Sequence, residues 1–268
     1  MKIGSDVSRY KVGDRVVVNW AGHALYSVKP EGLLNTRGIV TNPSAMYNIR
    51  KDALVRIPDN VGTLDASFAN IASFSFNGVR KLHLEIGESA MIAGQGILGV
   101  FALQVAALSG AVPLIAADFS PERRALAKKL GADYALNPGD KDYLEQIKEI
   151  TGGEMAHQVM ECSGANPAIR QTFDLVSNAG RITLTGWPKK ETSLPTDVIT
   201  KKEIDIRGAR TSAGEFEEAL DLINSRKVDM MKILTKTVTM DEAPDTIVDI
   251  EKNPGNYMKV VVRVSNDD

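Results

Sequence analysis

Short apolar runs recur along the middle of the chain and alternate with helical patterns of apolar and polar residues. The runs predict buried strands at residues 90–93, 112–117, 134–136, 158–162, 181–185 and 204–207. The helical patterns between them predict helices at residues 98–108, 121–130, 141–150 and 167–177. Strands that alternate with helices in this way are typical of a parallel, doubly wound α/β sheet of the Rossmann type.

The two ends of the chain follow different patterns. The start is β-rich at residues 15–20 and 47–57, and a helical pattern follows at 64–81. The tail predicts a helix, a strand, a second helix and a last strand at residues 215–225, 233–238, 242–251 and 258–264. We therefore expect three regions, which are residues 1–70, 71–211 and 212–268, and the middle one carries the sheet.

Local capping signals support two of the predicted helices. Ser120 precedes Pro121, which gives a side-chain cap followed by a proline at the first helical position, and Gly131 can end that helix. Asn166 and Pro167 repeat the arrangement.

The strongest functional signal is a glycine motif that follows the first predicted strand of the sheet. Gly94, Gly96 and Gly99 enclose Ile97 and Leu98 in the pattern GxGxxG. A strand before the motif and a helix after it are the context expected of a dinucleotide-binding turn. The helix N-terminus there would offer backbone N–H groups to a diphosphate. The plain alternative is that the glycines only close a tightly packed turn.

An acidic residue at the end of the second predicted strand strengthens this interpretation. Asp118 lies 118 − 99 = 19 residues after the last glycine, where an acid accepts hydrogen bonds from the adenosine ribose. Its charge would repel the 2′-phosphate of NADP, so NAD is favoured, although Arg123 could soften that repulsion and leaves NADP open. Ser163 and Gly186 end later strands at the same sheet edge, and we assign them to the cofactor site. Trp187 either edges this pocket or fills a loop.

Charge and composition exclude several classes of protein. The net charge is −2, which gives no electrostatic footprint for nucleic acid or an anionic membrane. No apolar run is long enough to span a bilayer, and no signal-peptide core is present. The lone cysteine, Cys162, excludes an internal disulfide and is read as a small core residue. These features predict a soluble, cytoplasmic protein.

These motifs and their flanks resemble the medium-chain dehydrogenase/reductase superfamily, which includes the zinc-type alcohol and polyol dehydrogenases. The similar stretches are residues 4–18, 90–111, 114–138, 161–187 and 201–210 and the tail ending MKVVVRV. Residues 20–23 and 76–80 are most similar to a short subgroup of bacteriochlorophyllide dehydrogenase-like enzymes. The resemblance implies an N-terminally shortened GroES-like domain beside the Rossmann domain, and NAD(P)-dependent hydride transfer to or from a small alcohol, polyol or carbonyl compound. It also implies a homodimer that pairs through the sixth strand.

The chain departs from the family pattern where zinc is concerned. The family's catalytic cysteine, Gly-His-Glu motif and four-cysteine lobe have no counterparts, and Asn70 stands where a zinc ligand is typical. We therefore expect no zinc. His23 is then the candidate acid or base, against the plain reading of an ordinary loop histidine. Two alternatives stay open, which are a catalytically impaired nucleotide-binding relative and a truncated gene product of a zinc-dependent dehydrogenase.

Overall fold

The computed structural model describes residues 3, 5, 7, 8, 10–18, 54–210 and 215–264. It separates into two compact units. The first is formed by both ends of the chain, residues 1–73 and 211–268, and the second by residues 74–210. The boundary falls within one helix, α2 (Ala69–Leu82).

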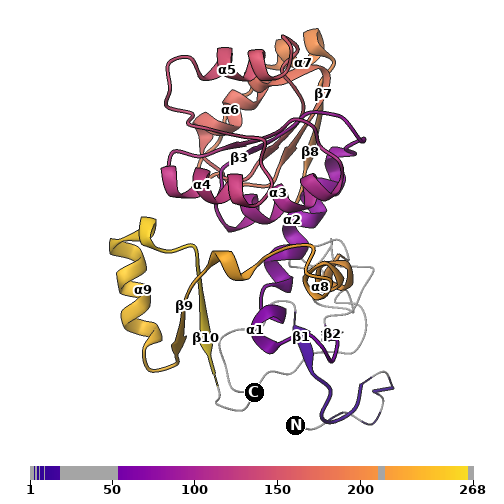
Figure 1. Ribbon diagram of the computed structural model, residues 1–268, viewed down its shortest axis with the longest axis vertical. Coiled ribbons are helices and arrows are strands. Elements are labelled where there is room, and N and C mark those ends of the chain that lie inside the picture. Colours follow the sequence, from indigo (N-terminus) through magenta and orange to yellow (C-terminus); the bar gives the residue numbers. More distant parts are fainter. Residues whose placement is uncertain are drawn as a thin grey trace. The chain divides into compact units, whose positions relative to one another are not determined.

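A parallel six-stranded sheet forms the centre of the second unit (Figure 1). Its strands are β3 (Ala90–Ala93), β4 (Leu114–Ala117), β5 (Tyr134–Leu136), β6 (Ala156–Glu161), β7 (Val176–Leu184) and β8 (Asp205–Gly208). Their spatial order is β5-β4-β3-β6-β7-β8, and every neighbouring pair is parallel. The chain therefore builds the sheet outward from β3 in one direction and then from β6 in the other. Such a reversal leaves a crevice at the carboxyl ends of the two central strands.

Helices cover both faces of this sheet (Figure 1). They are α3 (Ile97–Leu108), α4 (Pro121–Lys129), α5 (Tyr143–Ile150), α6 (Asn166–Leu175) and α7 (Thr196–Lys202), together with the second half of α2. Alternate strand residues serve opposite faces, as the pleat requires. Met91 packs in a cluster with Ile147 of α5 and Phe173 of α6. Met160 instead contacts Gly78 of α2, where an added Cβ would overlap the methionine side chain.

The predicted α/β fold is confirmed, and the differences lie at element boundaries. Helix α6 ends at Leu175 and β7 begins directly at Val176, five residues earlier than predicted. Lys202 stabilises this abrupt change, because its ammonium donates to the carbonyls of Phe173 and Val176, each at 2.8 Å. Helix α7, which supplies that lysine, was not predicted.

Only one of the two predicted caps has the expected form. Ser120 caps α4, since its hydroxyl accepts from the N–H of Arg123 at 3.2 Å. Asn166 does not cap α6, whose N-cap residue is Ala165. Its amide instead donates to the carbonyls of Lys190 and Glu191 and to the Thr192 hydroxyl. The asparagine therefore anchors the chain that leaves β7 rather than its own helix.

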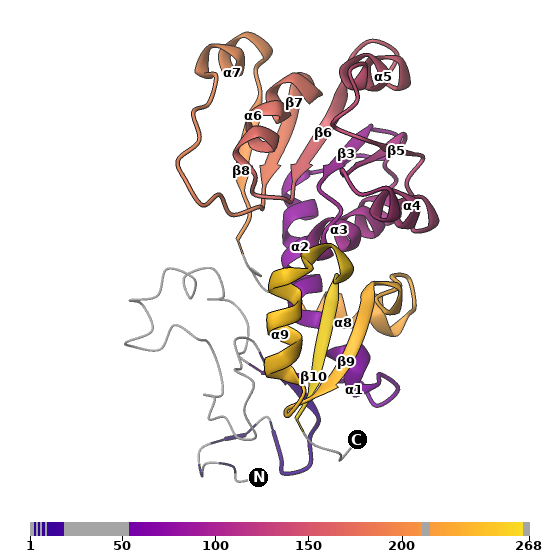
Figure 2. The same ribbon diagram turned by 90° about the vertical axis from the view of Figure 1, so that its left-hand side faces the viewer.

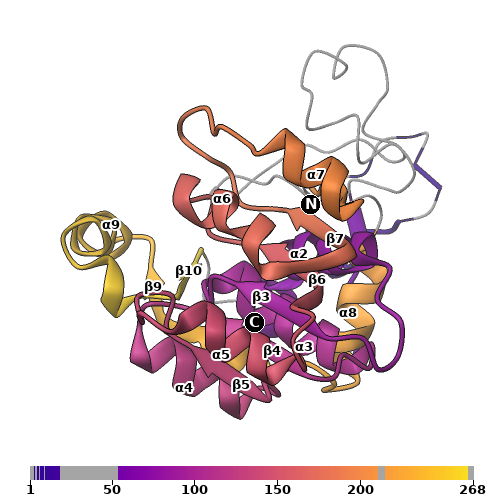
Figure 3. The ribbon, with the colours of Figure 1, turned by 90° about the horizontal axis from the view of Figure 1, so that it is seen from above.

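The first unit contains two small sheets. Strands β1 (Val16–Val18) and β2 (Leu54–Arg56) pair antiparallel, and β9 (Leu234–Thr239) and β10 (Lys259–Arg263) pair parallel. Helix α9 (Ala243–Lys252) joins β9 to β10 and packs beside them (Figures 2 and 3). Short 3₁₀ turns at Met231–Ile233 and Pro254–Asn256 and helix α8 (Phe216–Asn224) complete the described part of this unit.

The predicted helix at residues 64–81 is two helices in the structure, α1 (Thr63–Ala66) and α2. Ser67 separates them, because its hydroxyl donates to the carbonyl of Leu64 at 2.6 Å. A serine that bonds to the preceding turn competes with the helical pattern of backbone hydrogen bonds. The single helical period in the sequence does not reveal this break.

Candidate functional site

The glycine turn after β3 has the backbone geometry that the motif predicts. Gly94 has a φ of +90°, which a side chain would disfavour, and its N–H donates to the carbonyl of Ala117 at 2.8 Å. Gly99 lies against the turn, since an added Cβ would overlap the carbonyl oxygen of Gly94. Gly96 differs from both, because a Cβ there would meet no atom within 4 Å. The turn is therefore tightly packed behind Gly99 and open in front of Gly96.

The N-terminus of α3 presents unused donors at this open side. The first helical hydrogen bond runs from the N–H of Val100 to the carbonyl of Gly96 at 2.9 Å. Within the described ranges, the N–H groups of Ile97, Leu98 and Gly99 donate to no recorded acceptor. Gly96 caps the helix without a side chain. Three backbone donors at a helix N-terminus form a site suited to an anion such as a diphosphate.

Asp118 lies at the end of β4 with its carboxylate held by the adjacent loops. Oδ2 accepts from the N–H of Gln95 at 2.8 Å, and Oδ1 accepts from the N–H of Ser120 at 2.9 Å. Nη1 of Arg123 lies 3.8 Å from Oδ2. An ionised carboxylate has about four acceptor positions, so this carboxylate can still accept from ribose hydroxyls. The contacts fix its orientation and attach it to the glycine turn.

The two arginines that follow Asp118 have different roles. Arg123 is half-buried beside the carboxylate. Arg124 is not a simple solvated charge, because its guanidinium donates to the carbonyls of Asp118 and Phe119, both at 2.8 Å. Arg124 therefore stabilises the end of β4, and Arg123 is the one placed to influence the choice between NAD and NADP.

Glu161, at the end of β6, is a site residue that the sequence analysis missed. It is fully buried, and its carboxylate accepts from the N–H groups of Ser163 and Gly164 at 2.8–3.1 Å and from the Ser163 hydroxyl. The available signal was an acid within the apolar run at residues 158–162, near the carboxyl end of a strand as Asp118 is. Glu161 fixes the turn that carries Ser163.

Glycines bring the turns after β3, β6 and β7 into direct contact. A Cβ on Gly94 would lie 3.1 Å from Cβ of Ser163. A Cβ on Gly164 would lie 2.7 Å from the backbone of Trp187, and one on Gly186 would overlap Gly164 and the Glu161 carboxylate. The structure thus brings Gly94, Ser163 and Gly186 to one edge of the sheet, although they are far apart in sequence. Asp118 is attached to the same edge, because its carboxylate accepts from the N–H of Gln95 in the glycine turn.

Trp187 lies at the same edge and remains exposed. The guanidinium of Arg210 lies over the indole ring of Trp187, with its central carbon 4.0 Å from the centre of the ring. Asn77 is buried and donates to the carbonyl of Arg210 at 3.4 Å, so it has a packing role. The tryptophan therefore stacks on a cation rather than filling a loop.

The other candidates for chemistry are placed as follows. His23 lies outside the described residues. Burial and the nearby Glu161 carboxylate raise the pKa of the Cys162 thiol, which makes it a poor nucleophile. The backbone N–H of His157 donates to the Ser89 hydroxyl at 3.0 Å, and its ring Nδ1 accepts from the Ser89 N–H at 3.3 Å; Ser89 directly precedes β3, at the opposite end of the strands from the carboxyl edge. Asn70 is half-buried in α2.

No group of three or more His, Cys, Asp or Glu side chains suited to a metal ion occurs among the residues that the structure describes. A zinc site needs about three such ligands in one cluster. The donors of the described residues therefore do not fit zinc. None of the described helices has the length and apolar character needed to cross a bilayer.

Known proteins resemble this chain in sequence and fold. The zinc-binding dehydrogenase family model matches residues 98–225. A zinc-type alcohol dehydrogenase-like protein of Haemophilus influenzae is 42% identical over 77% of this chain and 60% of its own length. D-xylulose reductase of Saccharomyces cerevisiae is 26% identical over 97% of this chain and 77% of its own length. A protein described as a zinc-binding dehydrogenase of Sinorhizobium meliloti, bound to NADP, superposes with a TM-score of 0.81 at 19% identity, covering 98% of this chain and 80% of that one.

The parallel sheet, its glycine turn and these relatives define an α/β protein of the Rossmann, dehydrogenase-like type. Residues 98–225 match the zinc-binding dehydrogenase family model, and the relatives support the medium-chain dehydrogenase/reductase superfamily. It spans 60% of the length of the Haemophilus protein and 77% of the length of the yeast reductase.

Proposed function

We propose that this protein is an NAD-dependent oxidoreductase that transfers a hydride between the nicotinamide ring and a small alcohol, polyol or carbonyl compound. The observation that carries the proposal is the carboxyl edge of the sheet, where the unused N–H groups of residues 97–99 lie beside the acceptor Asp118. Relatives named as D-xylulose reductase and sorbitol dehydrogenase support the substrate class.

Each part of the crevice has a role in this proposal. The N–H groups of Ile97, Leu98 and Gly99 bind the diphosphate, and the open side of Gly96 lets it approach the backbone. Asp118 accepts from the adenosine ribose, and Glu161 holds the turn of Ser163 that borders the site. NAD supplies the hydride chemistry when bound, and the protein supplies binding and orientation.

We infer a preference for NAD because the Asp118 carboxylate would repel a 2′-phosphate. The opposing observation is Arg123, at 3.8 Å from that carboxylate, together with a structural neighbour bound to NADP. NADH fluorescence titration tests this directly. NADH should bind more tightly than NADPH, and Asp118→Ala should weaken NADH binding about tenfold or more, as expected for a hydrogen bond to a charged group.

The control for this titration is Asp221→Ala, since Asp221 is an exposed acid of α8 in the other unit. It should leave both affinities unchanged. Equal binding of the two cofactors by the unsubstituted protein would contradict the role of Asp118.

We further propose that turnover does not depend on zinc and that the protein is cytoplasmic, as its lone cysteine favours. Purified protein should contain well below one equivalent of zinc, and a chelator should leave any oxidation of sorbitol or reduction of xylulose unchanged.

Cofactor binding without turnover on a panel of alcohols, polyols and ketones would favour the alternative function, which is an impaired nucleotide-binding relative. Chelator-sensitive turnover would contradict the zinc-free mechanism. His23→Ala tests the candidate acid or base in the same assay.

A further inference from the structure

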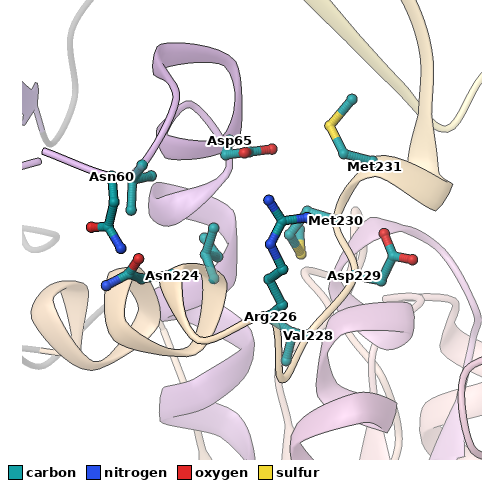
Figure 4. Close-up of a pocket in the computed structure, with 10 residues that line it drawn as sticks. Asn60, Asp65, Asn224, Arg226, Val228, Asp229, Met230 and Met231 are labelled. Carbon is teal, nitrogen blue, oxygen red and sulfur yellow. The ribbon is translucent and has the colours of Figure 1, made fainter. Parts of the chain in front are cut away.

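The first unit contains a pocket of about 300 Å³ that shares no residue with the cofactor crevice (Figure 4). Its polar lining comes from Asn60 before α1, Asp65 in α1, and Asn224 and Arg226 at the end of α8. Buried Val228 and Met230 form part of the apolar wall. A volume of this size is at the lower end of the range for small-molecule sites.

Four of the polar side chains of this pocket have no recorded partner among the described residues. Across the described parts of the chain, no hydrogen bond or ion pair is recorded for the side chains of Asp65, Asn224 or Arg226, nor for that of Asn60. Asp229, which also lines the pocket, differs because its carboxylate pairs with Lys232 at 3.2 Å. Figure 4 shows the guanidinium of Arg226 extending into the pocket toward the side where Asp65 projects.

The backbone of Arg226 has a conformation that its side chain disfavours. Arg226 has a φ of +53° and follows the C-cap of α8. The N–H of Lys227 bonds to the carbonyl of Leu222, and the N–H of Arg226 bonds to that of Ile223. This is the helix-ending motif in which glycine is the favoured residue at the left-handed position. An arginine there is disfavoured by its side chain, and residues kept in such conformations cluster at binding sites.

The charges of the pocket select the chemistry of a ligand. Arg226 is a cation and Asp65 an anion, and they are not paired with each other in the described structure. A phosphate would meet one cation and the two carboxylates of Asp65 and Asp229, which is unfavourable. A small zwitterion would match both charges, with its carboxylate on Arg226 and its ammonium on Asp65. The amides of Asn60 and Asn224 can complete its hydrogen bonds, and the apolar wall can take a short aliphatic group.

We propose that this pocket binds a small α-amino acid or a zwitterion of the same kind. The proposal concerns the first unit alone and does not rest on the cofactor site. The probe is L-leucine, measured by isothermal titration calorimetry with the full chain. Two analogues isolate its charges, because 4-methylpentanoate lacks the ammonium group and 3-methylbutylamine lacks the carboxylate. L-Leucine should bind about tenfold or more tightly than either analogue, since each lost group removes a charge-assisted hydrogen bond.

Substitutions then test which side chain binds the carboxylate of leucine and which binds its ammonium group. Arg226→Gln and Asp65→Asn should each weaken leucine binding about tenfold. Arg170→Gln, at an exposed arginine of α6 in the other unit, should change nothing. Arg226→Gly separates a role in binding from a role in stability. Glycine suits the left-handed conformation, so the substitution should not destabilise the fold. This variant should unfold at the same Tm as the unsubstituted protein or above it, and should still lose leucine binding.

Three results would overturn the proposal. The first is no detectable heat from L-leucine at millimolar concentration. The second is equal binding of leucine and its two analogues. The third is leucine binding that persists in Arg226→Gly and Asp65→Asn. NADH titration of the same samples should be unaffected throughout, so a failure here is distinguishable from a failure of the proposed cofactor site.

Discussion

At the scale of single residues, Gly96 and Gly99 belong to one motif but have different surroundings. Gly96 has extended backbone angles, with a φ of −72° and a ψ of −171°, and open space where a Cβ would lie. Gly99 has the Gly94 carbonyl at that position. The folded protein therefore has room for a methyl group at Gly96 but not at Gly99.

This difference predicts opposite effects for two alanine substitutions. Gly96→Ala should change the free energy of unfolding by only about 0.5 kcal/mol, since the backbone suits alanine. It should nevertheless weaken NADH binding strongly, because the methyl group occupies the approach of the diphosphate. Gly99→Ala should lower the free energy of unfolding by about 3 kcal/mol through overpacking. Urea unfolding and NADH titration of both variants measure this, and a Gly96→Ala variant with normal NADH affinity would contradict the binding site.

Cys162 predicts a dependence of stability on alkaline pH. Burial raises the pKa of its thiol in the folded state, whereas an unfolded cysteine ionises near about 8.5. Above that value the unfolded state loses a proton that the folded state keeps, so the contribution of Cys162 to stability is present below about pH 8.5 and decreases as the pH rises.

The measurement is urea unfolding between about pH 7 and pH 10, compared with Cys162→Ala. The substituted protein should lose less stability over this range than the unsubstituted one. A thiol reagent at pH 8 should modify Cys162 only after unfolding, and fast modification of the native protein would contradict the burial of the thiol.

At the scale of elements, the turns at the carboxyl edge are joined by backbone donors and carboxylates rather than by apolar packing. Glu161 accepts from the turn after β6, and Gly186 lies against it from the turn after β7. Asp118 joins the end of β4 to the turn after β3. The edge that we propose as the cofactor site is therefore fixed by two acids, each at the end of a buried strand.

Glu161→Gln tests this arrangement. One carboxylate oxygen becomes an amide donor that faces backbone N–H groups, so the free energy of unfolding should fall by about 2 kcal/mol. NADH affinity should fall as well, because the Ser163 turn borders the glycine turn. Ser163→Ala is the matched control, since it removes one hydroxyl and leaves the backbone donors in place, and it should cost about 1 kcal/mol. Unchanged stability in Glu161→Gln would show that the carboxylate does not hold the turn.

At the scale of the whole molecule, β8 is the last strand of the described six-stranded sheet and has one unpaired edge. An exposed edge of a sheet favours pairing with another strand. We propose that two copies pair through β8 about a two-fold axis, which would extend the sheet across a dimer. Light scattering at micromolar concentration should then give twice the chain mass of 29.0 kDa. A mass that stays at 29.0 kDa at all concentrations would contradict the dimer.

The sequence by itself determined the parallel α/β fold, the glycine turn and the position of Asp118. These features depend on local patterns, which are short apolar strands, helix periods, and glycines at a fixed spacing after a strand. The break at Ser67 and the role of Asn166 could not be found in the same way. Both depend on which carbonyl groups a polar side chain reaches, and that choice is made by the folded chain.

Only the tertiary structure revealed the partners of Glu161 and the pocket around Arg226. Glu161 faces residues next to it in sequence, but Gly186, in the turn after β7, packs against its buried carboxylate. Asp65 and Arg226 are separated by more than half of the chain and line one pocket because the two ends of the chain fold together. A linear pattern records the spacing of residues along one element, whereas burial and charge pairing depend on distances between elements, and only packing sets those distances.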